Sequence, residues 1–550
     1  MKGIQGLLLG VAIAGCSRTD AGPSADKFAG LAPVSLDKAQ ALDKSLENYF
    51  APLQTQRTYI QTDKPMYQPG ETIWFRADLR AAKSGQGKPS VGLTMQLVSP
   101  RGAIVAQKRV LALNGVARND FALAPEIEGG EYTVKLFSDY GANDFKKIII
   151  NTYEAPRLMK QLELLRKAYG EGDEVSASVE IKRQSGEVFA DRPFTAVVTL
   201  DDAEVSRLSQ KTDKDGKAIV KFKLPSKIAR GDGLLAVMVE DGGVTETIQK
   251  RIPIVLKTMQ LSLFPEGGDL IAGVPGRVYF MSKNPLGKPA DIEGRVVDDR
   301  GQLVSQFKSV HDGMGSFELT PAADRKYKVE ITKPTNIVTT AEVPAAKADG
   351  CVVRAVEQKP EHLRVGVICK TKRKVEVEAT LRENRLAGGA FDVDAGRPTL
   401  VELPIARSVQ GPVRVTLFSD KLEPLAERLI FHGAPGLKIT LTADRKSYQP
   451  RDRVKLRVHT TDASGKPVKA NVAVAVVDDT VLSYADDKSS KILAHLLLES
   501  ELGATEQDPI EEPNYYFSEK PDAVAALDAL LATRGYRRFE WQRVPLQGGK

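Results

Sequence analysis

The sequence predicts an all-β protein of tandem immunoglobulin-like β-sandwiches with a small helical segment near its C-terminal end. Apolar and polar residues alternate in short runs, turns containing Gly, Pro, Asn-Gly or Asp-Gly separate the runs, and one strand–turn–strand pattern recurs. About seven short strands per ~100 residues, with turns roughly every 8–12 residues, is typical of such sandwiches. No long helical pattern lies between residues 56 and 480, which argues against an α/β architecture.

The recurring pattern sets the expected number of domains. Its clearest copy is residues 59–79, and it recurs at Tyr169 and Tyr448 and more loosely near Ala272. The first three copies lie roughly 100 residues apart, which fits one sandwich each, and the longer gap from Ala272 to Tyr448 leaves room for a further, divergent unit. The expected units are sandwiches at 56–152, 153–256, 257–335 and 336–435, and strands of a fifth sandwich at 436–484. Sandwiches in series predict an elongated molecule in which each unit chiefly touches its neighbours.

The charge composition limits the kinds of partner that the sequence predicts. The chain has 550 residues, of which 78 are basic and 71 acidic, giving a net charge of +7. The two signs are interspersed and the basic runs are short, so we expect no nucleic-acid partner.

The N-terminus predicts a lipoprotein signal peptide at residues 1–15. Lys2 precedes an apolar run at 7–14, which is too short to span a bilayer because that needs ~20 residues. Gly15-Cys16 ends the run, and small residues before a cysteine resemble the bacterial lipoprotein box, in which the cysteine is lipidated. The resemblance implies lipidation of Cys16 in the bacterial cell envelope, with Ser17 favouring the outer membrane, facing the periplasm or the surface. An ordinary signal peptide cut elsewhere is the alternative.

Residues 16–55 predict a tether and a short helix. The small, polar and Pro/Gly-bearing residues at 17–34 are typical of a flexible linker. A helix is expected over 36–50 because apolar residues recur on one face at helical spacing, namely Leu36, Ala39, Leu42 and Leu46.

The two remaining cysteines predict a disulfide. Cys351 and Cys369 stand symmetrically about Pro360 in a strand–turn–strand pattern, so an antiparallel hairpin places them opposite one another. An oxidising compartment favours their bonding.

The C-terminal residues 485–550 predict an exposed loop and a helical tail. Residues 492–498 suggest a short helix, and the acidic stretch that follows suggests an exposed loop. A second helix is expected between Pro521 and Gly535, with Val524, Leu527, Leu530 and Leu531 on one face. We interpret 485–513 either as a bait-like or partner-docking loop or as a plain linker.

Several motifs carry a family resemblance. Residues 59–71, Tyr-Ile-Gln-Thr-Asp-Lys-Pro-Met-Tyr-Gln-Pro-Gly-Glu, closely resemble the opening of a macroglobulin (MG) domain of the alpha-2-macroglobulin family. Residues 472–482 are similar to the strand entering that family's bait-bearing domain, and 512–517 and 533–539 are similar to bacterial relatives, where this segment precedes the plug of TonB-dependent receptor-like proteins. The resemblance implies macroglobulin sandwiches and a peptidase-inhibitor ancestry with protein or peptidase partners.

The sequence also departs from that family. Its covalent trap uses a thioester within Cys-x-Glu-Gln, but Cys16, Cys351 and Cys369 are followed by Ser-Arg-Thr, Val-Val-Arg and Lys-Thr-Lys. We therefore expect no thioester and a chain without the thioester half.

No pattern predicts catalysis. The histidines lack metal-ligand spacing, no Gly-x-Ser-x-Gly elbow occurs, and adjacent carboxylates such as Asp478-Asp479 point to opposite faces of a strand. The five histidines are His311, His362, His432, His459 and His495. We expect no enzyme, metal or cofactor, and interpret the chain as a lipid-anchored protein that binds proteins or peptidases. The alternative is an accessory or scaffold subunit of an outer-membrane TonB-dependent-receptor-like transport or surface-assembly complex.

Overall fold

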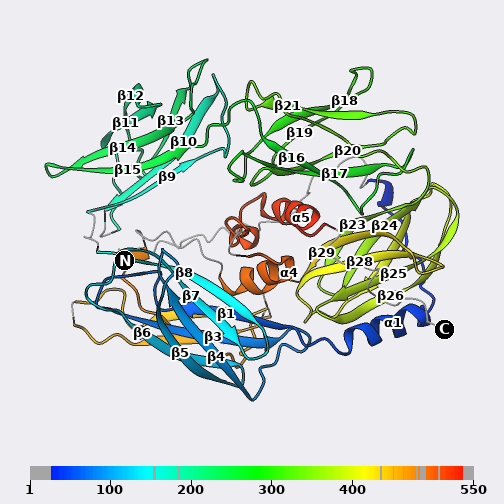
Figure 1. Ribbon diagram of the computed structural model, residues 1–550, viewed down its shortest axis with the longest axis horizontal. Coiled ribbons are helices and arrows are strands. Elements are labelled where there is room, and N and C mark those ends of the chain that lie inside the picture. Colours follow the sequence, from blue (N-terminus) through cyan, green and yellow to red (C-terminus); the bar gives the residue numbers. More distant parts are fainter. Residues whose placement is uncertain are drawn as a thin grey trace, which may run out of the picture.

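Four β-sandwiches surround a central helical segment in the computed structural model (Figure 1). The structure describes residues 26–152, 157–183, 186–433, 436–449, 451–462, 464–478, 481–482, 491–505 and 508–536. Strands dominate, so the prediction of an all-β fold with a short C-terminal helix is confirmed. Within these ranges, no helix has the length and apolar character needed to cross a bilayer.

The first sandwich is one eight-stranded sheet that folds back on itself, in the order β1-β3-β6-β5-β4-β7-β8-β2. Side chains alternate inward and outward along β4, and the inward set is buried, as the period of two requires. The strands are β1 (Gln56–Thr62), β2 (Met66–Tyr67), β3 (Thr72–Ala81), β4 (Ser90–Val98), β5 (Ile104–Leu113), β6 (Val116–Ala122), β7 (Gly130–Ser138) and β8 (Asn143–Ile150).

The next three sandwiches share one plan, a three-stranded sheet packed on a four-stranded sheet. The second contains β9 (Leu158–Leu164), β10 (Glu174–Arg183), β11 (Pro193–Leu200), β12 (Ala203–Lys211), β13 (Lys217–Lys223), β14 (Gly233–Asp241) and β15 (Val244–Ile252). The third contains β16 (Gln260–Pro265), β17 (Gly276–Lys283), β18 (Glu293–Asp298), β19 (Leu303–Lys308), β20 (Met314–Leu319), β21 (Tyr327–Lys333) and β22 (Thr340–Glu342). The fourth contains β23 (Cys351–Lys359), β24 (His362–Cys369), β25 (Arg373–Leu381), β26 (Asn384–Val393), β27 (Thr399–Pro404), β28 (Gly411–Ser419) and β29 (Pro424–His432). Strand β22 pairs with β21, so the third sandwich extends beyond the expected boundary at 335.

The recurring tyrosine has a structural reason. In each clear copy, the backbone N–H three residues earlier donates a hydrogen bond to the tyrosine hydroxyl, which fixes the turn before the next strand. The three bonds run from Lys64 to Tyr67 (3.3 Å), from Arg166 to Tyr169 (3.1 Å) and from Arg445 to Tyr448 (3.2 Å). The repeat therefore reflects turn chemistry.

Two of the Asn-Gly and Asp-Gly turns adopt the backbone conformation that their sequences favour. Asn114 and Gly115 have φ of 50° and 75°, and Asp312 and Gly313 have φ of 48° and 69°. Positive φ at both central residues is the geometry of a tight type I′ hairpin.

The fifth unit differs from its prediction. Its described part holds a two-stranded sheet of β30 (Lys438–Ala443) and β31 (Leu456–Thr461), and residues 472–477 form no strand there. The side chains of β30 are exposed on both faces. This part of the unit is therefore not a sandwich.

Residues 26–50 run along the fourth sandwich. Helix α1 (Gln40–Phe50) follows a 3₁₀ turn, η1 (Asp26–Phe28), and buries Leu42 and Leu46 in a cluster with Phe418. The helix begins later than residue 36 because Asp37 forms a β-bridge with Ala390.

The sandwiches form a closed ring, so the prediction of an elongated molecule is wrong. The fourth sandwich reaches the first, where the Asn384 side-chain amide donates a hydrogen bond to the Lys83 carbonyl at 3.1 Å. These residues are 301 positions apart, and no local sequence pattern indicates such a contact.

Candidate functional site

A central segment, residues 491–505 and 508–536, occupies the middle of the ring (Figure 1). Its elements are α3 (Ile492–Ala494), the π-helical turn η2 (His495–Glu499), α4 (Ser500–Leu502), the 3₁₀ turn η3 (Tyr515–Phe517) and α5 (Ala523–Thr533). Its buried side chains pack against Tyr279 and Met314 of the third sandwich and Leu429 of the fourth. The segment therefore joins parts that are far apart in sequence.

The prediction of an exposed loop over 485–513 holds only in part: Ile492 and Pro509 are exposed, but other described residues of that stretch are not. Ala494, Leu498, Leu502 and Ile510 are buried against the sandwiches. A bait must be accessible to a peptidase, and this packed helical arrangement offers little access between 494 and 502.

His495 links the central segment to the first sandwich. Its Nε2 lies 3.3 Å from Asp144 Oδ2 of β8, and its Nδ1 lies 2.9 Å from Glu499 Oε2. Burial disfavours the charged imidazole, but hydrogen bonds and ion pairing with the two carboxylates outweigh it and raise the pKa of His495 to about 10. At neutral pH the ring is therefore a cation held between two anions.

Glu501 links the first and fourth sandwiches through the central segment. Its two carboxylate oxygens pair with Arg57 of β1 at 2.9 Å and with Arg382, which follows β25, at 2.5 Å. Burial lowers the pKa of Arg57, although the Glu501 carboxylate opposes this. Glu501 thus bridges two sandwiches where the ring closes.

Lys167 links the second and third sandwiches to the central segment. Its Nζ lies 2.5 Å from Asp312 Oδ1 and 2.9 Å from Glu512 Oε1. Burial raises the pKa of Asp312 to about 6 despite the opposing ammonium. Beside it, His311 stacks on Tyr515 with ring centroids 3.6 Å apart, and burial lowers the pKa of His311 to about 4.

A buried ionic network joins the third sandwich, the fourth sandwich and α5. Glu266 accepts hydrogen bonds from Arg354 Nε at 2.9 Å and Arg428 Nε at 3.2 Å. Arg428 also donates to Asp528 of α5 at 2.6 Å and to the Tyr279 hydroxyl at 3.0 Å. Burial alone would raise the pKa of Glu266, but the surrounding arginines hold it below its usual value. Breaking such a network is strongly destabilising, because it leaves a buried charge uncompensated.

These titratable groups are engaged in contacts between domains. In the described parts of the chain, no group of three or more His, Cys, Asp or Glu side chains could hold a metal ion. The arrangement suits a mechanical role, in which charges hold the ring and its central segment together.

Comparison with known proteins finds one domain family and several similar proteins. The MG2 domain family matches residues 57–148, which cover nearly all of the first sandwich. A curated alpha-2-macroglobulin of Ralstonia nicotianae is 21% identical over 506 residues, covering 82% of this chain and 31% of the relative. The chain thus resembles the alpha-2-macroglobulins.

Solved bacterial alpha-2-macroglobulins are also similar to this macroglobulin-like chain. The trypsin-activated Escherichia coli protein is 12% identical, with a TM-score of 0.43 over 75% of this chain and 33% of that one. The methylamine-reacted Salmonella protein is 14% identical, with a TM-score of 0.36 over 80% of this chain and 34% of that one. The macroglobulin-like chain thus spans about a third of the length of these relatives.

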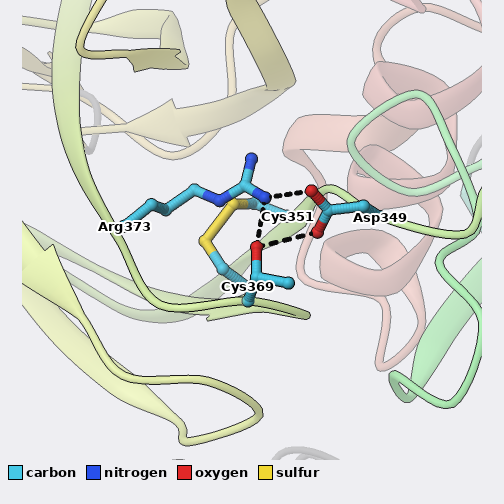
Figure 2. Close-up of a disulfide and its surroundings, with 5 residues drawn as sticks. Asp349, Cys351, Cys369 and Arg373 are labelled. Carbon is cyan, nitrogen blue, oxygen red and sulfur yellow. Dashed lines mark hydrogen bonds and ion pairs between the residues drawn. A yellow bond between two sulfur atoms is a disulfide. The ribbon is translucent and has the colours of Figure 1, made fainter.

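Cys351 and Cys369 are disulfide-bonded in the fourth sandwich of the macroglobulin-like ring, opposite one another on β23 and β24 (Figure 2). The sulfur atoms are 2.02 Å apart. Beside them Arg373 and Thr371 donate hydrogen bonds to Asp349. The disulfide belongs to the core of that sandwich and takes no part in the central segment. Cys16 lies outside the described residues.

Sequence reasoning did not single out the residues that hold the central segment of the macroglobulin-like ring. Arg428, Asp528 and Glu501 look like ordinary surface charges in the sequence, and His495 stands in no metal-ligand spacing. The one available signal was the apolar face of the tail helix, although Val524 from that face is 66% exposed while Ala526 and Ala529 are buried.

Proposed function

We propose that this chain is a non-enzymatic protein-binding protein of the alpha-2-macroglobulin type whose partners are peptidases or other proteins. The observation that carries the proposal is the closed ring of sandwiches held by one central segment, because it provides a rigid frame with large surfaces for a protein partner. The similarity to a bacterial alpha-2-macroglobulin supports the same class of function.

The proposal includes an envelope location. Cys16 is the lipidation site, and the acyl chains anchor the protein in the outer membrane, facing the periplasm or the surface. Two or more acyl chains give stable anchoring, since each buried CH₂ contributes about 0.8 kcal/mol. Metabolic labelling with palmitate tests this step: wild type takes up label and Cys16→Ser does not. Equal labelling of both would contradict it.

A capture experiment tests the binding role. The Cys16→Ser protein, immobilised, is exposed to bacterial envelope extract and separately to trypsin and to elastase. The binding role is supported if the resin retains a peptidase or a defined envelope protein and the retained amount reaches a plateau as more of that protein is added. Retention of neither above a blank resin contradicts it.

The alternative, an accessory subunit of an outer-membrane receptor-like complex, rests on the tail at 512–545. The described part of the tail packs largely against the sandwiches of the ring: Tyr516 is buried, and Tyr536 donates a hydrogen bond to the Gly268 carbonyl at 2.7 Å. That role would therefore depend on exposed side chains of the tail. If deletion of residues 512–545 left co-purification with a receptor unchanged, the alternative would lose its basis.

A further inference from the structure

A cavity of about 880 Å³ lies between the first sandwich and the central segment. Its floor contains consecutive residues of β1 and β8, and its opposite wall includes His495, Ser500 and Pro509. Figure 1 shows β7, β8 and β1 side by side, facing the central helices. The volume is within the range of sites that bind small ligands or peptide segments, roughly 300–1,000 Å³.

Two neighbouring residues in this cavity carry buried polar atoms that lack partners. Within the described structure, Gln56 Oε1 and the Nε and Nη1 of Arg57 are buried and make no hydrogen bond. The remaining terminal nitrogen of Arg57, Nη2, pairs with Glu501. Buried polar groups in native proteins nearly always have a partner, so these atoms indicate a missing one.

The missing partner must both accept and donate hydrogen bonds. Arg57 offers only N–H groups and therefore needs an acceptor, whereas Gln56 Oε1 is an acceptor and needs a donor. A peptide unit supplies a carbonyl and an N–H together. Gln56 and Arg57 both line this cavity, at the start of β1.

The strand edges beside the cavity favour the same kind of ligand. In the described sheet β1 pairs with β3 on one side only, and β8 pairs with β2 only at Ile149 and Ile150. An open strand edge is a template for an added strand, the mode called β-augmentation.

The side chains of the cavity fit a peptide better than a polyanion or a lipid. Tyr59, Phe137 and Phe145 supply aromatic surface. Lysines of β7 and β8 lie in the same cavity as Glu499 and Glu511, so the charge is mixed. Mixed charge beside aromatic rings suits a peptide with both apolar and polar side chains.

We propose that this cavity binds an extended peptide segment of a partner protein, which lies along the open edge of β1, supplies a carbonyl to Arg57 and donates an N–H to Gln56. The inference rests on the proposed protein-binding function and names the part of the partner that the ring holds.

A selection from a synthetic library of random short peptides tests this site. Peptides retained by wild type are labelled, and their dissociation constants are measured by fluorescence anisotropy for wild type and three variants. Ser500→Trp fills the cavity and should weaken binding more than tenfold. Gln56→Leu removes the unpaired acceptor and should weaken binding about tenfold, the effect of one hydrogen bond. Ser209→Trp, on the exposed surface of β12, is the matched control and should bind as wild type does.

Thermal melting of each variant separates loss of the site from loss of the fold. If Ser500→Trp fails to fold, Gln56→Leu decides, because it removes an unpaired polar atom and should not destabilise the protein. Failure of wild type to select any peptide, or wild-type affinity in both cavity variants, overturns the proposal. If the protein captures a peptidase but binds no peptide, the proposed peptide site is wrong and the proposed function stands. If it binds peptides here but captures no protein, the peptide site stands and the proposed function is wrong.

Discussion

Arg428 of β29 donates a hydrogen bond from Nη2 to Asp528 Oδ1 of α5 at 2.6 Å, so an ion pair joins the fourth sandwich to the central segment. The Arg428 side chain is 3% exposed and also binds Glu266 and Tyr279. This pair makes the position of the tail helix depend on a strand 100 residues earlier.

Asp528→Asn should destabilise the protein by about 3 kcal/mol, because it removes one carboxylate from a buried arginine. Chemical denaturation followed by circular dichroism measures the free energy of unfolding. The matched control is Asp232→Asn, which breaks the exposed pair with Arg251 and should change stability by less than about 0.5 kcal/mol. Equal effects of the two substitutions would show that the Arg428 network does not hold α5.

His495 should make stability depend on pH. Its folded pKa is about 10 and its unfolded pKa is about 6.5. Since the folded pKa is the higher, the contribution is fully present below about pH 6.5 and is lost as the pH rises through about 10. His495→Gln lacks this contribution, so the difference in Tm between wild type and variant should shrink over that window. Parallel curves of Tm against pH would contradict the ion pairing with Asp144 and Glu499.

Removal of the disulfide should destabilise the fourth sandwich by roughly 2–4 kcal/mol, because the two cysteines close a short loop. The double substitution of Cys351 and Cys369 by alanine should show this loss under oxidising conditions. Reduced wild type serves as the control and should fall to the stability of the variant. Thiol labelling of the native protein that finds both cysteines free would count against the bond.

The recurring tyrosine should matter most where it is buried. Tyr169→Phe removes a hydroxyl that accepts a hydrogen bond from the Arg166 backbone and donates one to the Ser176 carbonyl, and should destabilise by about 1–3 kcal/mol. Tyr448→Phe removes the equivalent hydroxyl from an exposed turn and should have a smaller effect. The free energy of unfolding, measured for both variants, tests this prediction. A larger loss of stability in Tyr448→Phe than in Tyr169→Phe would argue against the role of burial.

The sequence predicted the elements better than their assembly. Alternation along runs such as β10 and the tyrosine turns that precede the strands are local properties, and they indicated the sandwiches. The pairing of Cys351 with Cys369 also followed from hairpin symmetry. The lipidation of Cys16 stays a prediction.

Closure of the ring depends on contacts between residues hundreds of positions apart, such as Asn384 with Lys83 and Glu501 with Arg57. The sequence alone does not indicate which individual charged residues will be buried in the folded protein. The acidic stretch around Glu501 therefore predicted an exposed loop, although Arg57 and Arg382 neutralise it inside the ring.

Crosslinking between the first and fourth sandwiches tests ring closure most directly. In a variant with Lys83→Cys and Asn384→Cys, made without Cys16, mild oxidation should join the two new cysteines in the monomer. Mass spectrometry of the digested monomer should identify the linked peptides. The matched control pairs Lys83→Cys with Ser209→Cys on the second sandwich and should form no such bond. Absence of the first crosslink in a folded monomer would contradict the closed ring.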